Sequence, residues 1–183
     1  MPNCEFILEN SETQDWLYPH LFDYIHMRAI APCFNDLSTV LTRAYHHTRP
    51  GGWIEIQDAL WEPQCIDDTL KGTALERWCQ LVVIASAKAG RDMTKTIHAK
   101  HYLLQAGYVD VVEKTFAVPG SPWPKDRKMK VLGMYLQQVL LTAVSSYRKL
   151  LIGLGISAEE VDELLSLVKQ DLMNRGIHWY TQV

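Results

Sequence analysis

Polar side chains with acid–base capacity follow two apolar segments in the first third of the chain. His26 and Arg28 stand at the end of residues 21–27, and Asp58 directly follows residues 53–57. Both segments are typical of buried parallel strands, and such strands present their carboxyl ends at one edge of a sheet, where ligands bind. The spacing therefore predicts a site in which His26 exchanges a proton, Arg28 polarises a carbonyl or enolate, and Asp58 orients either of them.

Apolar and aromatic side chains are expected to line this site. The predicted substrate contacts are Met27, Leu60, Trp61, Trp78, Met134, Tyr135 and Gln138. The last four lie on predicted helices that would cover the pocket, and their periodicity indicates that they serve the core first. Such a lining suits a small, partly apolar, carbonyl-bearing substrate.

The same residues also admit a purely structural interpretation. His26 can be a hydrogen-bonded core histidine, Arg28 can simply pair with Asp58, and Trp61 can merely pack against its neighbours. His178, on the last predicted strand, is equally open to a structural or a functional role.

No metal site is predicted. His98 and His101 lie three positions apart on a predicted helix, a spacing that can bind metal, but no cysteine or carboxylate completes the pattern. A surface pair is therefore favoured. The four cysteines form no Cys-x-x-Cys motif and are expected to be reduced, small residues of the core.

The predicted elements alternate between strand and helix. A helix is expected at 37–48, between the two apolar segments, with Asn35 or Asp36 as its cap. A strand–helix–strand unit of this kind joins parallel strands right-handedly. Further strands are predicted at 4–8, 109–118 and 177–183.

Further helices are predicted in the second half of the chain. Their expected ranges are 73–89, 94–105 closed by Gly107, and 125–154 with a break near Thr142 or Ser145. Ser157 and Glu160 form a capping box that starts the last helix.

Composition is typical of a globular protein rather than of a nucleic-acid-binding or membrane protein. The chain has 183 residues, of which 48% are hydrophobic and 21% charged, and a formal net charge of −3. We expect one domain over residues 1–183, no nucleic-acid partner and no membrane span. Without a signal peptide at its start, the chain is expected in the cytoplasm, or in the nucleus if it is regulatory.

Several motifs, taken together in their order and spacing, resemble a known family. They are residues 22–28, 49–58, 67–72 and 106–114, the turn Trp123-Pro124-Lys125-Asp126 and the closing His178-Trp179-Tyr180. This set is similar to the class I methyltransferases of the fungal LaeA-like group, which depend on S-adenosylmethionine (SAM) and comprise regulators and tailoring enzymes of secondary metabolism.

The resemblance implies a partial Rossmann-like α/β fold. The family's sheet has seven strands in the order 3-2-1-4-5-7-6, and this chain would supply strands equivalent to 3-4-5-7-6 with a helical lid at about 121–156. It would lack the first two strand–helix units. SAM is held in the family by a glycine-rich loop after strand 1, whereas no glycine precedes Gly51 here. The expectation is therefore that no cofactor binds.

Loss of strand 1 would leave the strand at 21–27 as an apolar edge. Such an edge invites pairing with another chain. The sequence therefore predicts a homodimer through this edge, with or without exchange of the segment at 4–8.

The leading functional hypothesis is a methyltransferase-derived enzyme that no longer methylates. It would be a cofactor-independent cyclase, pericyclase, isomerase or lyase that performs a cyclisation, cycloaddition, dehydration or isomerisation on a polyketide- or terpenoid-like molecule in fungal secondary metabolism. Two alternatives remain: a non-catalytic regulatory partner of a LaeA-like methyltransferase, and a fragment of an active SAM-dependent methyltransferase.

Overall fold

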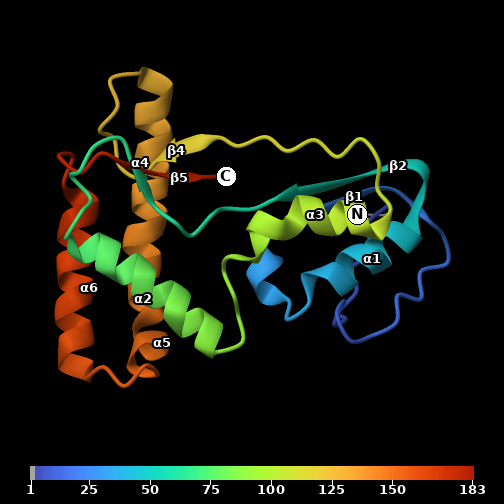
Figure 1. Cartoon of the computed structure of the whole chain (residues 1–183), viewed down its shortest axis with the longest axis horizontal. Helices are drawn as coiled ribbons and strands as arrows, with labels where there is room; N and C mark the ends of the chain where they lie inside the picture. The colour runs from blue at the N-terminus through green and yellow to red at the C-terminus, as the bar shows by residue number, and fades with distance from the viewer. Residues whose placement is uncertain (1–2) are drawn as a thin grey trace.

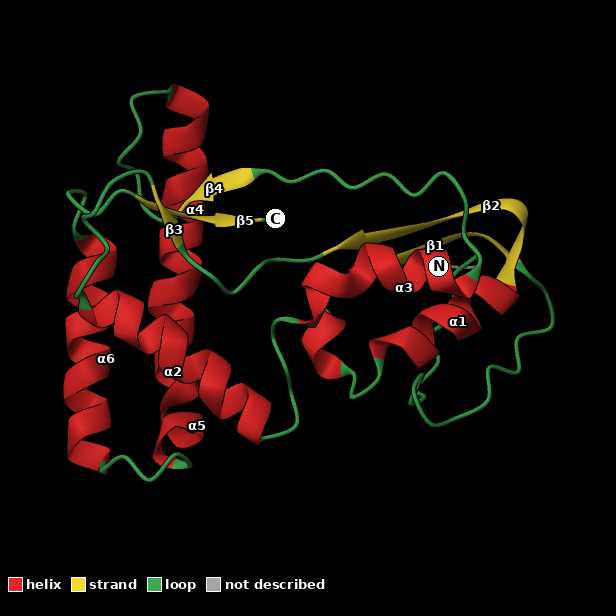
Figure 2. Ribbon diagram, in the orientation of Figure 1, coloured by secondary structure: helices red, strands yellow, loops and turns green. Residues whose placement is uncertain are grey.

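A computed structural model describes residues 3–183 and places their elements in two groups. Figures 1 and 2 show one group of strands and helices beside a second group, which is dominated by helices and contains a short antiparallel sheet. We call them the first lobe and the second lobe. The buried apolar residues likewise divide into two clusters, one in each lobe.

The first lobe is built on a parallel strand pair. Strand β1 (Phe22–Arg28) pairs with β2 (Thr48–Gln57), and helix α1 (Leu37–His47) connects them. Asp36 caps α1, because its side chain accepts a hydrogen bond from the backbone of Thr39. The predicted strand–helix–strand unit is therefore confirmed.

One face of the β1–β2 pair packs on helices and the other does not. Ile25 and Met27 of β1 join the apolar cluster that α1 and α3 (Ala99–Ala106) complete. Because side chains alternate along a strand, the residues between them lie on the opposite face. The exposed residues on that face, which we call the open face, are Tyr24, His26 and Arg28 on β1 and Trp53, Glu55 and Gln57 on β2.

The second lobe combines a helical core with a three-stranded antiparallel sheet. Its main helices are α2 (Ala74–Lys88), α4 (Arg127–Ala143), α5 (Arg148–Ile152) and α6 (Ala158–Met173). The strands β3 (Gln64–Cys65), β4 (Ala117–Pro119) and β5 (Trp179–Gln182) are ordered β3-β5-β4. Strand β5 therefore joins two segments that are far apart in the sequence.

Short 3₁₀ turns connect several elements. They are Ala31–Cys33 after β1, Lys95–His98 before α3, and Val144–Tyr147 between α4 and α5. The last of these confirms the predicted break in the long helical stretch. Gly107 ends α3 in the left-handed conformation, and the capping box of Ser157 and Glu160 starts α6, both as predicted.

The sheet expected from the sequence is not present as one piece. The described residues form two small sheets, so the predicted strand order is not confirmed. Residues 4–8 were predicted as a strand but pair with nothing in the described chain, and Phe6 and Leu8 are exposed. Residues 109–118 are strand only at Ala117–Pro119. A strand requires a neighbour for its backbone hydrogen bonds, and β-propensity alone does not supply one.

Cysteine placement also differs from expectation. All four cysteines are free, but only Cys79 is buried, whereas Cys4 and Cys33 are exposed. Burial raises the pKa of the Cys79 thiol to about 12.

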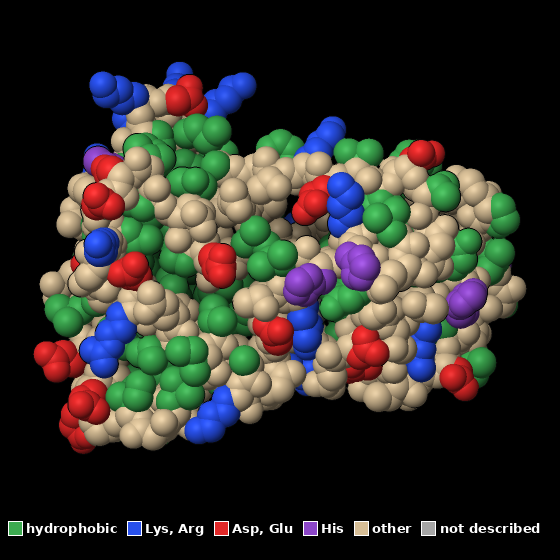
Figure 3. All heavy atoms as spheres, in the orientation of Figure 1, with side chains coloured by type: hydrophobic (Ala, Val, Ile, Leu, Met, Phe, Trp, Pro, Cys, Tyr) green, Lys and Arg blue, Asp and Glu red, His purple; other side chains and the backbone are tan. Residues whose placement is uncertain are grey.

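Exposed hydrophobic side chains mark the surface of α4. Among them are Leu132, Met134, Tyr135 and Val139. Figure 3 shows basic side chains at the tip where α4 begins and hydrophobic ones below it. Within residues 3–183, no helix is both long and apolar enough to cross a bilayer.

Candidate functional site

The three predicted catalytic residues lie on or next to the β1–β2 pair. His26 and Arg28 are exposed on the open face, paired in register with Glu55 and Gln57. Asp58 follows β2 at the carboxyl end of the sheet, as its position in the sequence predicts. The structure therefore brings His26 and Arg28 to one face and places Asp58 at its edge.

The Asp58 carboxylate is hydrogen-bonded to both of the loops that follow β1 and β2. Its Oδ2 atom accepts a hydrogen bond from the backbone of Ile30 at 3.2 Å, and its Oδ1 atom accepts one from Ala59 at 2.9 Å. This carboxylate therefore fixes the loops after β1 and β2 to each other, a structural role that is compatible with a further role toward a ligand.

A polar network surrounds His26 on the open face. The Tyr24 hydroxyl donates to Glu55, and Gln57 donates to the same carboxylate at 2.7 Å. Both hydrogen bonds lower the pKa of Glu55, and the one from Tyr24 contributes most. The hydrogen bond to Glu55 in turn raises the pKa of Tyr24. The rings of Tyr24 and His26 stack with centroids 6.1 Å apart and an interplanar angle of 13°. His26 thus lies on a flat surface that combines an aromatic ring with a carboxylate.

The predicted substrate contacts do not gather around His26. Met27 is buried on the opposite face of β1. Trp61 and Trp78 belong to the second lobe, where they pack against each other and against Tyr147 at centroid distances of 5.4–6.4 Å. Trp78 is only 1% exposed and is therefore a core residue.

The other predicted contacts also lie in or beside the second lobe. The backbone of Leu60 donates to Gln182 at 2.8 Å, which ties the end of the first lobe to β5. Met134, Tyr135 and Gln138 are exposed on α4. The role of these residues as substrate contacts stays a prediction.

Two surface hollows are described, and neither contains a predicted site residue. One of about 370 Å³ lies against Glu9–Thr13 and Arg91, and one of about 520 Å³ lies between α2 and α6. In the described part of the chain, no group of three or more side chains comes together that could hold a metal ion.

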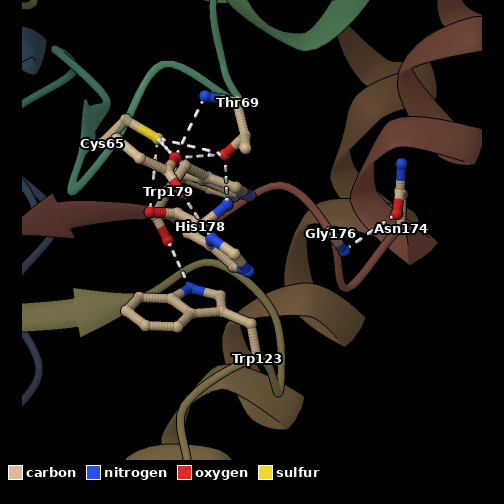
Figure 4. A network of polar contacts seen from close by, with 8 residues as sticks. Cys65, Thr69, Trp123, Asn174, Gly176, His178 and Trp179 are labelled. Carbon is tan, nitrogen blue, oxygen red and sulfur yellow. Dashed lines mark hydrogen bonds and ion pairs between the residues drawn. The ribbon is translucent and has the colours of Figure 1, made fainter.

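A second cluster of reactive groups lies in the second lobe and was not singled out from the sequence. His178 Nδ1 lies 2.6 Å from Asp67 Oδ2, with the two side chains 35% and 39% exposed respectively. Asp67 also accepts hydrogen bonds from the hydroxyl and the backbone of Thr69, at 2.5 and 3.0 Å. The Cys65 thiol donates to Asp67 at 3.2 Å. Figure 4 shows Cys65, Thr69 and His178 together with Trp123.

The hydrogen bonds to Asp67 stabilise its charged form. The Thr69 hydroxyl contributes most and His178 next, and together they hold the pKa of Asp67 far below its ordinary value of 3.8. Asp67 and His178 stand in two of the motifs described above, but they are 111 positions apart in the sequence. Only the pairing of β3 with β5 brings them into contact.

The described residues do not by themselves fit SAM. A nucleotide-type cofactor needs a glycine-rich turn after a parallel strand, where the backbone approaches the ligand closely. Strand β1 runs into Ala29 and Ile30, and β2 runs into Asp58 and Ala59, with no glycine in either turn.

Comparison with known proteins gives a consistent set of relatives. The chain is 29% identical to methyltransferase pytC of Aspergillus terreus over 96% of its own length and 55% of the relative. It is 30% identical to the probable methyltransferase tdiE of Emericella nidulans over 93% of its length and 54% of the relative. It is 24% identical to the secondary metabolism regulator laeA of Monascus pilosus over 97% of its length and 50% of the relative.

The chain thus spans about half the length of the curated relatives that it matches. No protein-family model matches it. The resemblance to LaeA-like methyltransferases, which the motifs indicated, is confirmed.

Proposed function

Because this chain is a homologue of the LaeA-like fungal methyltransferases over almost its whole length, we propose that it forms the substrate-binding part of a methyltransferase-type fold in fungal secondary metabolism. In this proposal β1 and β2 correspond to strands 4 and 5 of the family's sheet. The substrate is a small polyketide- or terpenoid-like molecule that binds over the open face and the carboxyl ends of the two strands.

One observation carries this proposal: His26 and Arg28 lie on the same exposed face of a parallel strand pair whose carboxyl end holds Asp58. Ligands of open α/β sheets bind at this end. His26 would exchange a proton with the substrate, and Arg28 would stabilise a carbonyl or enolate oxygen. Cyclisation, cycloaddition, dehydration or isomerisation can be assisted by these two groups without a cofactor.

The second edge of β1 is a place where another chain could bind beside this site. Strand β1 pairs with β2 along one edge, and none of the other described residues pairs with it along the second edge. An unpaired strand edge accepts another strand. We propose a homodimer through this edge, which would build a wall beside His26.

A first experiment separates cofactor-free chemistry from methyl transfer. Titration calorimetry of the chain with SAM should give no binding heat at micromolar concentration. Clear micromolar binding would contradict the cofactor-free mechanism and favour the alternative, a fragment of an active methyltransferase.

A second experiment separates an enzyme from a non-catalytic regulatory partner. A producing fungal strain would carry wild-type protein, His26→Ala, or the control His101→Ala on the exposed surface of α3. The enzyme hypothesis expects the product to fall roughly 10²-fold in His26→Ala alone, as is typical when an acid–base group is removed. Equal product from all three strains, at equal protein levels, would refute a catalytic role for His26.

A further inference from the structure

The Asp67–His178 pair in the second lobe is held more firmly than a surface ion pair. Asp67 accepts from His178 Nδ1 with one oxygen, while Thr69 and Cys65 donate to the other. The backbone N–H of His178 also donates to the Thr69 hydroxyl at 2.9 Å. Both the ring and the main chain of His178 are therefore fixed to the same loop.

This arrangement selects one tautomer of the neutral histidine. Because ionised Asp67 only accepts hydrogen bonds, His178 must carry its proton on Nδ1. The Nε2 atom is then the hydrogen-bond acceptor of the ring. With 35% of the side chain exposed, His178 is accessible to a molecule in solution.

Trp123 adds an aromatic surface beside the imidazole. The two rings lie with centroids 5.4 Å apart at an interplanar angle of 52°. The indole is itself anchored, since its Nε1 atom donates to the backbone oxygen of Trp179 at 2.8 Å. Figure 4 shows Trp123 and His178 side by side; Trp123 lies in the loop before α4, and His178 directly precedes β5. A rigid aromatic ring next to a basic nitrogen suits a flat ligand that carries a hydroxyl group.

We propose that Asp67 and His178 form a proton-transfer dyad that acts on the hydroxyl group of a phenol or enol lying against Trp123. The O–H bond of the ligand breaks, its proton forms a new bond with His178 Nε2, and the electron pair stays on the ligand oxygen. The imidazolium that results remains next to the Asp67 carboxylate, which stabilises it. Asp67 acts through His178 and is therefore a positioning residue.

This proposal does not depend on the function proposed for the β1–β2 pair, because its residues lie in the other lobe. A purely mechanical role, in which the pair only fastens the β3–α2 loop to β5, is the competing explanation. The backbone hydrogen bonds between β3 and β5 already join these segments. The two explanations differ for a variant that keeps the contact with Asp67 but lacks Nε2. A proton-transfer dyad would then bind a phenol more weakly, whereas a purely mechanical pair would not.

The first test uses para-nitrophenol, whose absorbance reports its ionisation, buffered at the pKa of the free phenol. Wild-type protein should bind it and increase its phenolate absorbance. His178→Asn keeps an N–H donor for Asp67 but has no counterpart of Nε2, so the affinity should fall on the order of tenfold with thermal stability unchanged. His98→Asn, in the first lobe, is the matched control and should behave like wild type.

Two outcomes would overturn the proposal. One is no phenolate signal with wild-type protein, and the other is the same signal with wild type and His178→Asn. If His178→Asn failed to fold, Trp123→Ala would take its place, because loss of the aromatic surface should weaken binding without touching the Asp67–His178 contact.

A second test reads the role of Asp67 without any ligand. Nitrogen NMR of protein labelled at histidine should show that the uncharged His178 ring carries its proton on Nδ1. The uncharged ring of free histidine carries its proton mainly on Nε2. Asp67→Asn should lose this preference. A His178 ring protonated on Nε2 in wild-type protein would refute the dyad.

Discussion

At the scale of single residues, the second lobe contains a backbone approach that only glycine permits. A Cβ atom added at Gly120 would lie 1.8 Å from Cε2 of Trp179, a ring that is 3% exposed. The ring cannot shift easily, because Trp179 is part of the main apolar cluster and its backbone oxygen accepts from Trp123. Gly120 therefore allows β4 and β5 to close over this core.

We expect Gly120→Ala to destabilise the protein by about 3 kcal/mol, at the upper end of overpacking costs. The measurement is the free energy of unfolding in urea. Gly176→Ala is the control, since the nearest atom to its added Cβ is the side-chain oxygen of Asn174 at 3.1 Å and its backbone is not left-handed. If both variants unfolded at the same urea concentration, the packing of Trp179 described above would be incorrect.

The sequence predicted the positions of some polar residues on the strands and missed one contact for a physical reason. The local pattern of an apolar segment followed by polar residues located His26, Arg28 and Asp58 at the end of a parallel pair. The contact between Asp67 and His178 has no such local pattern, because it depends on which distant strands pair. The helical periodicity that assigns Trp78 to the core first agrees with its packing against Trp61 and Tyr147.

At the scale of secondary structure, the helices agree with their predicted ranges more closely than the strands do. Helix α6 begins at its predicted capping box, where Ser157 Oγ accepts from the Glu160 backbone at 3.2 Å and the Glu160 carboxylate accepts from the Ser157 backbone at 3.3 Å. These bonds are local, so a short stretch of sequence encodes them. The segment at 109–118 has β-propensity, but only Ala117–Pro119 reaches a partner strand.

We expect Ser157→Ala to lower the free energy of unfolding by about 1 kcal/mol, because it leaves a backbone N–H at the helix start without its acceptor. Ser166→Ala, at an exposed position within α6, is the matched control and should change stability by about 0.5 kcal/mol or less. Chemical denaturation followed by circular dichroism measures both. If both variants lost the same free energy of unfolding, the Ser157 cap would make no specific contribution to stability.

At the scale of the whole molecule, the open face and the free edge of β1 form a surface suited to association. Trp53 on this face is 70% exposed, and Tyr24, its partner in register, is 52% exposed. Large exposed aromatic groups next to an unpaired strand edge favour contact with another chain. This feature underlies the homodimer proposed above.

We expect the mass from light scattering to rise with concentration and Trp53→Lys to suppress this rise. Stability should change by about 0.5 kcal/mol or less, because the side chain is not part of a core. Tyr135→Lys is the control: its side chain is also 70% exposed, but it lies on α4 in the other lobe. A constant monomer mass for wild type, or equal suppression by both variants, would contradict association through the open face.

The order β3-β5-β4 has a consequence for synthesis of the protein. Strand β5 is the middle strand, yet it is the last of the three to leave the ribosome. Until then β3 and β4 have no common neighbour, and the aromatic ring that Gly120 accommodates is still inside the exit tunnel. The sheet of the second lobe therefore cannot close before β5 has left the ribosome, and Trp179 joins the main apolar cluster only then.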